Sequence, residues 1–421
     1  MKKKKWLGLA LSASLMLGSL AACSSNSNGE TASSDGNTTI SFWTPFSGAD
    51  GPRMKNIVEN YNQSQSEYKV DLQIVPQTDY YKTVDLSFSN QNEGPDLLIM
   101  HTDQITNYSE KNLLKDLSST IEKSEINPED YAETAWDVGT VDGKQYSVPL
   151  DIHPLILYYN KDLFEAAGLD PEKAPTTGDE FLEYAKKLTD PSKNQYGYVV
   201  PTLWPNQFIF PTLFYQYGGE LLKDGKPNYA SDAGVKALTY LTDLVHKHKV
   251  SPVNVQQDGE VTLFLQGKNA LHLNGPWMME QWDSAGINYG VAEVPQFGDQ
   301  QAVYANGHNF VIPVTVEDEK TLEGVSDFLK YIQGNAMEWA KSGQAPASKA
   351  IYEDNEEFKS MVQQPIVAKE FEYAKFAPEI ANWGQVSDPL WAEVNLALLG
   401  KKDPKQALED ANKKAEQFLN K

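Results

Sequence analysis

Two periodicities of hydrophobic and polar positions run along the chain, and each predicts its own kind of element. Apolar and polar residues alternate through 70–75 (VDLQIV), and 39–43 (TISFW) is rich in β-forming residues, so both segments are expected as strands. Apolar residues three and four apart predict helices over 53–62, about 232–248 and around 325–332. A further helix is expected after Thr177, because Thr177 and Glu180 fit a capping box.

One segment breaks the alternation. After Gly94 and Pro95, the run 96–100 (DLLIM) is apolar at four positions in succession, which predicts a strand buried on both faces. Strands and helices alternate from residue 39 onward, an order typical of α/β proteins. The pattern therefore predicts an α/β fold with mostly parallel sheets flanked by helices.

The first 22 residues have the pattern of a secretory signal peptide. Lysines at 2–5 precede an apolar segment at 6–20 that is too short to span a membrane, and small residues occupy 21 and 22. The next residue, Cys23, is the only cysteine. The stretch LAAC resembles a bacterial lipobox, which implies that the thiol of Cys23 carries a diacylglycerol group. An ordinary signal peptide beside a chance cysteine is the alternative.

The polar segment that follows predicts a tether. Residues 23–37 contain no apolar side chain larger than alanine after the cysteine, so a flexible linker reaching roughly 20 Å is expected. The chain beyond it is too long for one hydrophobic core and predicts two domains. With no second cysteine, packing alone must hold these domains together. We expect a monomer anchored through lipid at the extracellular face of the bacterial cytoplasmic membrane.

Charge excludes one class of partner. The formal net charge is −22, and Arg53 is the only arginine. Such a surface repels phosphate backbones, and no basic stripe with interleaved aromatic residues occurs in the sequence, so no nucleic-acid partner is expected. The scarcity of arginine also argues against anionic ligands, because guanidinium is the group best suited to carboxylate and phosphate.

Five groups of motifs occur in order along the body of the chain. They are GPDL at 94–97; VPLD, LYYNKDLF and AGL within 148–169; FLQGKNAL and NGPW within 264–277; NYGV and VP within 288–295; and GQAPAS at 343–348. None is specific alone, but together they resemble landmarks of the family 1 extracellular solute-binding proteins and follow the order of that family from about residue 38 to the C-terminus. These proteins are the sugar receptors of ABC importers and include the maltodextrin-binding proteins.

The resemblance implies two α/β lobes with the ligand held in the cleft between them. We expect residues 38–153 and 308–345 in the N-terminal lobe, and 154–307 and 346–421 in the C-terminal lobe. Three hinge crossings are expected, near 151–154, 305–309 and 345–348. Domain interfaces are also where ligands bind on general grounds.

A sugar site requires flat aromatic rings for the faces of the sugar and polar groups for its hydroxyls. Trp277, in NGPW, is the strongest candidate for such a ring, followed by Trp204 and Trp383 and then Trp43, with core packing as the alternative for each. The remaining tryptophans of the body lie in helical or amphipathic contexts and are interpreted as packing residues. They are Trp136, Trp282, Trp339 and Trp391.

The polar candidates come from strand ends and crossings. Asp103 follows the buried strand, in the loop where the family places a sugar-binding acid. His153 stands where the maltodextrin-binding proteins carry an acid, so a different hydroxyl pattern is expected. A turn or cap role is the alternative for the Asp and Asn candidates. The other candidates are Asp151, Asn206, Asn274 and Asn309.

These features predict a carbohydrate-binding lipoprotein that captures a neutral mono- or oligosaccharide and delivers it to the transmembrane subunits of an ABC importer. No cofactor and no metal are expected, because His246 and His248 lie on different faces of a helix. A lipid-anchored glycoside hydrolase is the alternative, since Asp103 and Asp151 could meet across the cleft as a catalytic pair. No other catalytic motif is present in the sequence.

Overall fold

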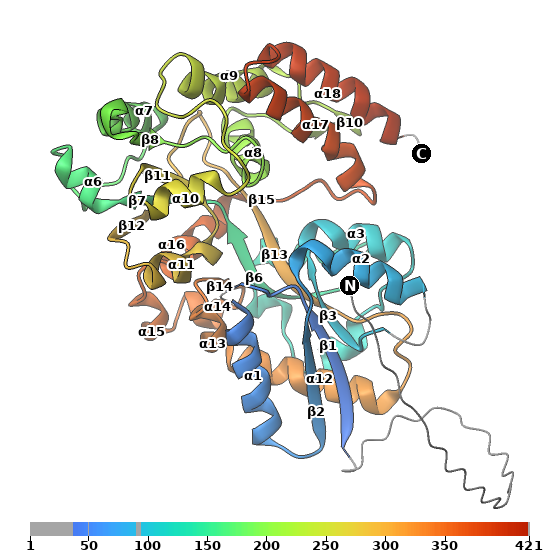
Figure 1. The fold of residues 1–421 in the computed structure, drawn as a ribbon. Coiled ribbons are helices and arrows are strands. Elements are labelled where there is room, and N and C mark those ends of the chain that lie inside the picture. The colour runs from blue at the N-terminus through green and yellow to red at the C-terminus, as the bar shows by residue number, and fades with distance from the viewer. Residues whose placement is uncertain (1–36, 49, 90–93, 420–421) are drawn as a thin grey trace, which may run out of the picture.

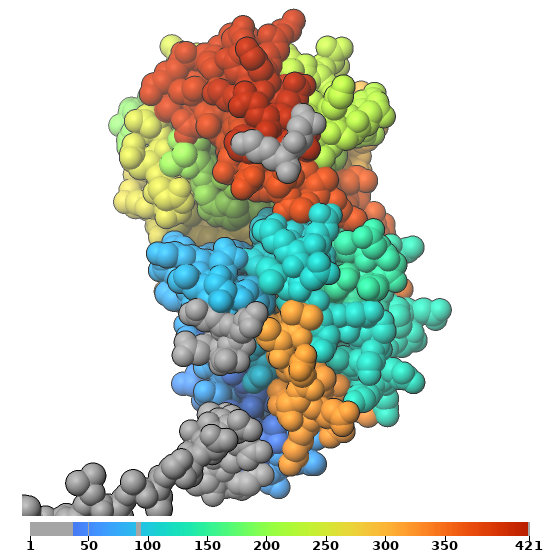
Figure 2. Space-filling view, turned by 90° about the vertical axis from the view of Figure 1, so that its right-hand side faces the viewer, coloured from blue at the N-terminus to red at the C-terminus, as the bar shows by residue number. Residues whose placement is uncertain are grey.

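The computed structural model describes residues 37–48, 50–89 and 94–419. The expected signal peptide and Cys23 lie outside these residues. The described chain forms two lobes, which Figures 1 and 2 show one above the other. No helix in this described part of the chain combines the length and hydropathy that a membrane span requires.

The lower lobe is built on a seven-stranded sheet. Its strands, in spatial order, are β14 (Ala345–Pro346), β6 (Val148–Pro154), β13 (Val303–Val311), β3 (Leu97–His101), β1 (Thr38–Thr44) and β2 (Tyr68–Ile74), and β15 (Ala374–Lys375) pairs with one end of β13.

Both faces of this sheet are buried, as the apolar run at 96–100 predicted. Leu97 and Ile99 belong to the cluster that packs against α1 (Asp50–Ser64) and α12 (Glu319–Gly334). Leu98 and Met100 pack on the opposite face with residues of α2 (Gln77–Ser89) and α3 (Thr102–Glu110). Figure 1 shows the sheet between these helices.

The loops that matter for a site leave this sheet at one edge. Strands β1, β2 and β3 are parallel, so the segments that follow them, starting at Pro45, Val75 and Thr102, open on the same side. That side faces the upper lobe (Figure 1). The carboxyl ends of parallel strands are a usual location for ligand sites.

The upper lobe surrounds a four-stranded sheet. Its strands, in spatial order, are β12 (Tyr289–Ala292), β7 (Ile156–Asn160), β11 (Asn269–Asn274) and β8 (Tyr196–Tyr198). Its helices are α6 (Lys161–Ala166), α7 (Gly178–Leu188), α8 (Asn206–Gln216), α9 (Asp232–His246), α10 (Gly259–Leu265), α11 (Met279–Ser284), α17 (Trp383–Leu398) and α18 (Pro404–Leu419).

Short elements complete the chain. They are α4 (Ser118–Lys123), α5 (Glu133–Asp137), β4 (Thr140–Val141), β5 (Lys144–Gln145), β9 (Leu222–Lys223), β10 (Lys226–Pro227), α13 (Ala336–Ala340), α14 (Lys349–Tyr352), α15 (Glu356–Lys359), α16 (Gln364–Lys369) and the 3-10 turns η1 (Pro128–Asp130), η2 (Pro191–Lys193), η3 (Pro276–Met278) and η4 (Glu370–Tyr373).

The two-lobed α/β architecture is as expected, but the sheets are mixed rather than mostly parallel. In the lower sheet β13 runs antiparallel to both β3 and β6, and in the upper sheet β7 runs antiparallel to β11 and β12. The reason is that β6 carries the chain out of the lower lobe and β13 carries it back, so these neighbours run in opposite directions. The three expected crossings fall in β6, β13 and β14, and the exact limits of the lobes stay a prediction.

The helices that hydrophobic periodicity predicted are present. Helix α1 includes 53–62, α12 includes 325–332, and α9 ends two residues before the expected position 248. At the start of α7, the Glu180 backbone N–H donates to Thr177 Oγ1 over 3.2 Å. The Glu180 carboxylate accepts from the N–H of Thr176, one residue earlier than an ideal capping box requires.

One acid in the upper lobe is buried without a hydrogen-bond partner for its carboxylate. Glu260, in the first turn of α10, is 1% exposed, and neither side-chain oxygen has a partner among the described residues. Burial raises the pKa of Glu260 to about 7. The folded state therefore retains this proton at pH values where the unfolded chain has lost it.

This acid makes the free energy of unfolding fall as pH rises from about 4.5 toward 7, since the unfolded state ionises first. Replacing Glu260 with Gln removes that penalty. We expect E260Q to match the unmodified protein at pH 4, where the unfolded chain also keeps the proton, and to exceed its unfolding free energy at pH 8 by on the order of 3 kcal/mol. Urea unfolding at both pH values measures this. The exposed Glu122→Gln is the control, and a pH-independent difference for E260Q would contradict the prediction.

Candidate functional site

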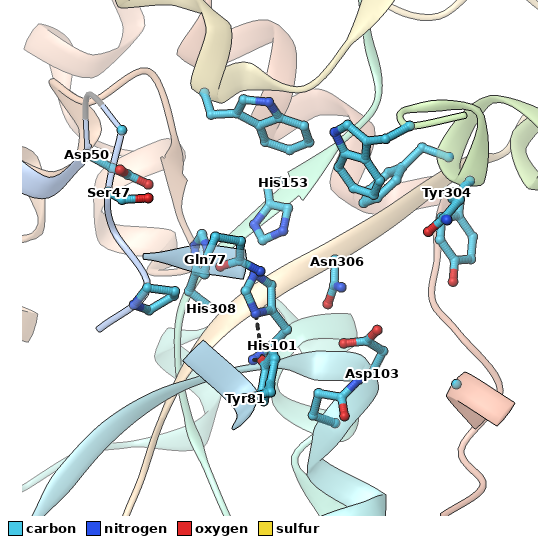
Figure 3. A pocket seen from close by; sticks show the side chains of 18 of the residues that line it. Ser47, Asp50, Gln77, Tyr81, His101, Asp103, His153, Tyr304, Asn306 and His308 are labelled. Carbon is cyan, nitrogen blue, oxygen red and sulfur yellow. Dashed lines mark hydrogen bonds between the residues drawn. The ribbon is translucent and has the colours of Figure 1, made fainter. Parts of the chain in front are cut away.

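A cavity of about 610 Å³ lies between the two lobes. Its lower wall comes from the segments after β1, β2 and β3, and its upper wall from α8, η3 and the start of α17. Cavities of 300–1,000 Å³ with apolar walls and a few placed polar groups are typical of small-molecule sites. Figure 3 shows polar groups from several elements directed into this space.

Aromatic rings form the upper wall. The rings of Trp204 and Trp277 are stacked with centroids 6.2 Å apart, and Phe208 packs edge-on against both. Tyr304 from β13 extends this wall through a contact with Phe208 at 5.3 Å. Trp204 remains 36% exposed, so the wall presents a ring face to the cavity rather than a closed core.

The sequence around Trp277 explains its position. The Trp277 ring lies against the backbone of Gly275, where an added Cβ would come within 2.0 Å of the ring. Asn274 Oδ1 accepts the Gly275 N–H over 2.8 Å and holds the turn before η3. Glycine is therefore required in NGPW by a close approach, and the asparagine by the turn.

Carboxyl and amide groups line the opposite side. Asp103, in the first turn of α3, faces Asn306 of β13 (Figure 3). Burial raises the pKa of Asp103, and hydrogen bonds from Asn306 and Gln104 offset part of this effect. Burial also raises the pKa of Asp50, which lines the cavity at the start of α1. Two acids thus line this side of the cavity from the first turns of two different helices.

Three histidines lie on the floor, and strand register brings them together. Asp151 of β6 pairs with His308 of β13, and His308 pairs with His101 of β3. These residues therefore lie in one row across three neighbouring strands. His153 is two residues along β6 and so lies on the same face as Asp151. The ring centroids of His153 and His308 are 4.4 Å apart, and those of His101 and His308 are 4.9 Å apart.

Asp151 holds two of these imidazoles from below. Its Oδ1 lies 3.0 Å from His153 Nδ1, and its Oδ2 lies 2.9 Å from His308 Nδ1. Trp339 Nε1–H donates to Oδ2 over 2.7 Å, and the His308 backbone N–H donates to Oδ1. The carboxylate is fully buried. It therefore fixes the orientation of both rings while remaining out of reach of a ligand.

Burial and neighbouring charges determine the protonation states of the side chains on the cavity floor. Burial lowers the pKa of His153 to about 4, with the nearby His308 adding to the shift. Burial, together with His308 and His153, also holds the pKa of His101 well below its ordinary value. Burial alone would raise the pKa of Asp151, but His308 and the hydrogen bonds from both rings hold it below its usual range. At neutral pH the floor thus contains one carboxylate and neutral His101 and His153.

The part of the chain that forms the two lobes matches a known protein family. The family model described as bacterial extracellular solute-binding protein matches residues 56–366. This chain belongs to that family. The resemblance carried by the five groups of motifs is thereby confirmed.

Several relatives can be aligned with most of the length of this solute-binding protein. It is 25% identical to the galactooligosaccharide-binding protein of Bacillus subtilis over 408 residues, covering 93% of this chain and 92% of that protein. It is 27% identical to a maltooligosaccharide ABC transporter solute-binding lipoprotein of Streptococcus pneumoniae over 348 residues, or 77% of each. The crystal structure of the cyclic alpha-maltosyl-1,6-maltose binding protein of Arthrobacter globiformis has a TM-score of 0.78 at 25% identity, covering 91% of this chain and 99% of that one.

The cavity of this solute-binding protein brings together half of the residues that the sequence singled out. Those lining it are Asp103, His153, Trp204, Trp277 and Trp383. They come from both lobes and from segments far apart in the sequence. Whether each contacts a ligand stays a prediction.

The other five candidates do not line this cavity, and each has a structural reason. Trp43 is buried in the cluster between β1, α2 and α3, because its position in β1 points to that face. Asp151 lies beneath the histidines. Asn274 holds the turn at Gly275, and Asn309 Nδ2–H donates to Thr102 Oγ1 over 3.0 Å inside the lower lobe. Asn206 is buried in α8 and lines a second cavity.

That second cavity, of about 590 Å³, shares three lining residues with the first. They are Trp204, Gln207 and Trp391. Neither side-chain atom of Asn206 has a hydrogen-bond partner among the described residues. The interpretation of Trp391 as a packing residue is therefore incomplete, because its ring borders both spaces.

Sequence reasoning missed several residues that line the main cavity. His101 ends β3 immediately before the loop with Asp103, so the rule that placed Asp103 could also have found it. His308 and Asn306 are on the second crossing, where a period-2 pattern marks one face. The remaining polar residues carried no signal, because they lie in loops, at helix starts or within a short helix, where polar side chains are common for other reasons. They include Ser47, Asp50, Gln77, Gln281 and Gln344.

The buried carboxylate of Asp151 should be a major source of stability. In Asp151→Asn, an amide N–H would face donors where an oxygen now accepts. Since hydrogen bonds to a charged group contribute roughly 1.5–3 kcal/mol each, we expect the free energy of unfolding to fall by on the order of 3 kcal/mol.

Denaturant unfolding near pH 7 measures this loss. The exposed, cavity-lining Asp388→Asn is the matched control, and its change should stay within about 0.5 kcal/mol. Equal stability of the two variants would show that Asp151 does not organise the floor.

Proposed function

We propose that this solute-binding protein captures a neutral oligosaccharide in the cavity between its lobes and delivers it to the transmembrane subunits of an ABC importer. The observation that carries the proposal is the pairing of the stacked Trp204 and Trp277 rings with carboxyl, amide and imidazole groups in one cavity. Ring faces suit the C–H faces of a sugar, and the polar groups suit its hydroxyls.

The charge of the cavity favours a neutral ligand. Among the described residues that line it, there is no lysine and no arginine, whereas Asp50, Asp103 and Asp388 are present. A phosphate or carboxylate ligand would meet acids without a guanidinium or ammonium partner. The single arginine, Arg53, is not among the lining residues.

The size of the site favours an oligosaccharide. The main cavity and the second cavity share Trp204, Gln207 and Trp391, so one extended ligand can contact both. The names of the relatives above likewise refer to oligosaccharides. A monosaccharide would leave much of this aromatic wall without a partner.

Binding without turnover is part of the proposal. The acid pair of the hydrolase alternative was Asp103 and Asp151. Asp151 accepts hydrogen bonds from His153, His308 and Trp339 in full burial, so it cannot flank a glycosidic bond in the cavity. Membership of a solute-binding family points the same way.

We expect calorimetry to detect one molecule of maltotriose or of a galactotriose bound per chain, and no binding of sn-glycerol 3-phosphate. Trp277→Ala should lose roughly 1–3 kcal/mol of sugar affinity, by analogy with aromatic stacking platforms for bases. Its stability should change little, because the ring borders a cavity. Trp282→Ala is the matched control, since this fully buried ring should cost about 3–5 kcal/mol of unfolding free energy.

The same samples distinguish binding from hydrolysis. After incubation with stoichiometric protein, chromatography should recover the sugar intact. New reducing ends would favour the hydrolase, and preferential binding of the phosphate ester would contradict a neutral ligand.

We also propose that Cys23 anchors this protein to the membrane through a diacylglycerol thioether. The support is the order of lysines, apolar segment and LAAC in 2–23, followed by a polar linker. Two acyl chains on one residue suffice for lasting attachment, whereas one is marginal. The anchor would hold the body at the extracellular face of the cytoplasmic membrane.

Cys23→Ser should shift the protein from the membrane fraction to the medium, or leave it unprocessed at a higher mass. Fractionation with detergent partitioning and mass spectrometry of the N-terminal peptide measures both outcomes. Ser24→Ala keeps the thiol and serves as the control. Acylated protein from the Cys23→Ser gene would refute the anchor.

A further inference from the structure

The three histidines on the cavity floor have a geometry that neither sugar binding nor packing requires. One ring nitrogen from each of His101, His153 and His308 lies within 4.8 Å of the other two. All three residues line the cavity. Among the described residues, these three histidines form the one group of histidine, cysteine or acid side chains whose ligand atoms lie close enough together to share a metal ion.

The buried partners leave the outer nitrogens of these rings free. Nδ1 of His153 and Nδ1 of His308 both face the Asp151 carboxylate, so in the neutral form of each ring the proton lies on Nδ1 and Nε2 presents a lone pair. His101 Nδ1 lies 2.7 Å from the hydroxyl oxygen of Tyr81. With the His101 Nδ1–H donating to that oxygen, its Nε2 presents a lone pair as well. A carboxylate behind a metal-binding imidazole is the usual outer-shell partner at such sites.

We propose that His101, His153 and His308 bind a divalent transition-metal ion, with Zn²⁺ as the ion of reference, at the floor of the cavity. Three neutral imidazoles suit zinc, copper, nickel and iron, and they do not suit magnesium or calcium, which prefer oxygen ligands. Three protein ligands leave the fourth tetrahedral position open. All three histidines line the cavity, so the ion would be accessible to a molecule bound there.

The distances allow this with small movements. Nitrogen atoms around one zinc ion, each about 2.0–2.1 Å from it, lie roughly 3.3 Å apart. One nitrogen of each ring, Nδ1 or Nε2, already lies within 4.8 Å of the others, so these nitrogens would have to approach one another by no more than about 1.5 Å through rotation about the side-chain bonds. His101 is the freest to move, since it lies beyond the direct reach of Asp151 and is partly exposed.

The metal proposal does not depend on the identity of the solute, so it is tested without sugar. The full chain carrying Cys23→Ser, free of its single thiol and made without a polyhistidine tag, is treated with EDTA and desalted. Zn²⁺ is then titrated by calorimetry in excess Mg²⁺. Co²⁺ titration in the visible range reports directly on tetrahedral nitrogen coordination.

We expect one Zn²⁺ per chain and the visible bands of tetrahedral Co²⁺. His101→Ala and His153→Ala should each weaken Zn²⁺ binding by at least roughly 100-fold. That is the largest loss usually seen when only a residue behind a metal ligand is removed, and a ligand itself should matter more. His248→Ala, outside the cluster, is the matched control and should bind as before. Thermal unfolding confirms that each variant is folded.

The proposal would be overturned if the chain does not bind Zn²⁺, or if His101→Ala and His153→Ala bind it as tightly as before. The imidazoles would then be groups that hydrogen-bond directly to a ligand. If a variant fails to fold, Co²⁺ absorption of the otherwise unmodified chain still decides, because a spectrum without tetrahedral bands would also overturn it. Loss of sugar binding would not affect either result.

Discussion

A carboxylate that is removed from water must be given hydrogen-bond donors, and Asp151 obtains them from β6, β13 and α13 at once. Those elements come from two separate stretches of the chain, so the lower lobe cannot assemble its central row until both are in place. The same contacts set the rotation of His153 and His308. The packing of β6, β13 and α13 against one another and the shape of the cavity floor therefore depend on one buried charge.

Much of the fold could be predicted from local patterns because local physics determines it. The apolar run at 96–100 had to be a doubly buried strand, and the stripe of Val325, Phe328, Leu329 and Ile332 had to face a core. The direction of β13 could not be predicted in this way. It depends on where the chain returns from the other lobe, which no short window of sequence contains.

The residues of the candidate site can likewise be separated into those that a local pattern predicts and those that it does not. Trp277 could be identified because NGPW resembles a family landmark and places the ring in a Gly/Pro turn, and Asp103 because it follows a buried strand. Trp43 also ends a strand, but the sequence does not say which face of the sheet it enters. The cluster of three histidines could not be predicted, because His101, His153 and His308 are far apart in the chain and become neighbours only through strand register. His246 and His248, which are only two positions apart in sequence, take no part in it.

Apart from His101 of β3, the histidine floor of the cavity belongs to the strands β6 and β13 that join the lobes, whereas its walls belong to the lobes themselves. In any rotation about these crossings, an atom moves in proportion to its distance from the axis. Groups on β6 and β13, such as His153 and Asn306, are thus nearly stationary, while the walls swing. During such a rotation, a molecule held on the floor would keep its contacts there while the contacts at the walls changed. Substitutions on the crossing strands and substitutions on the walls would then act on separate parts of recognition.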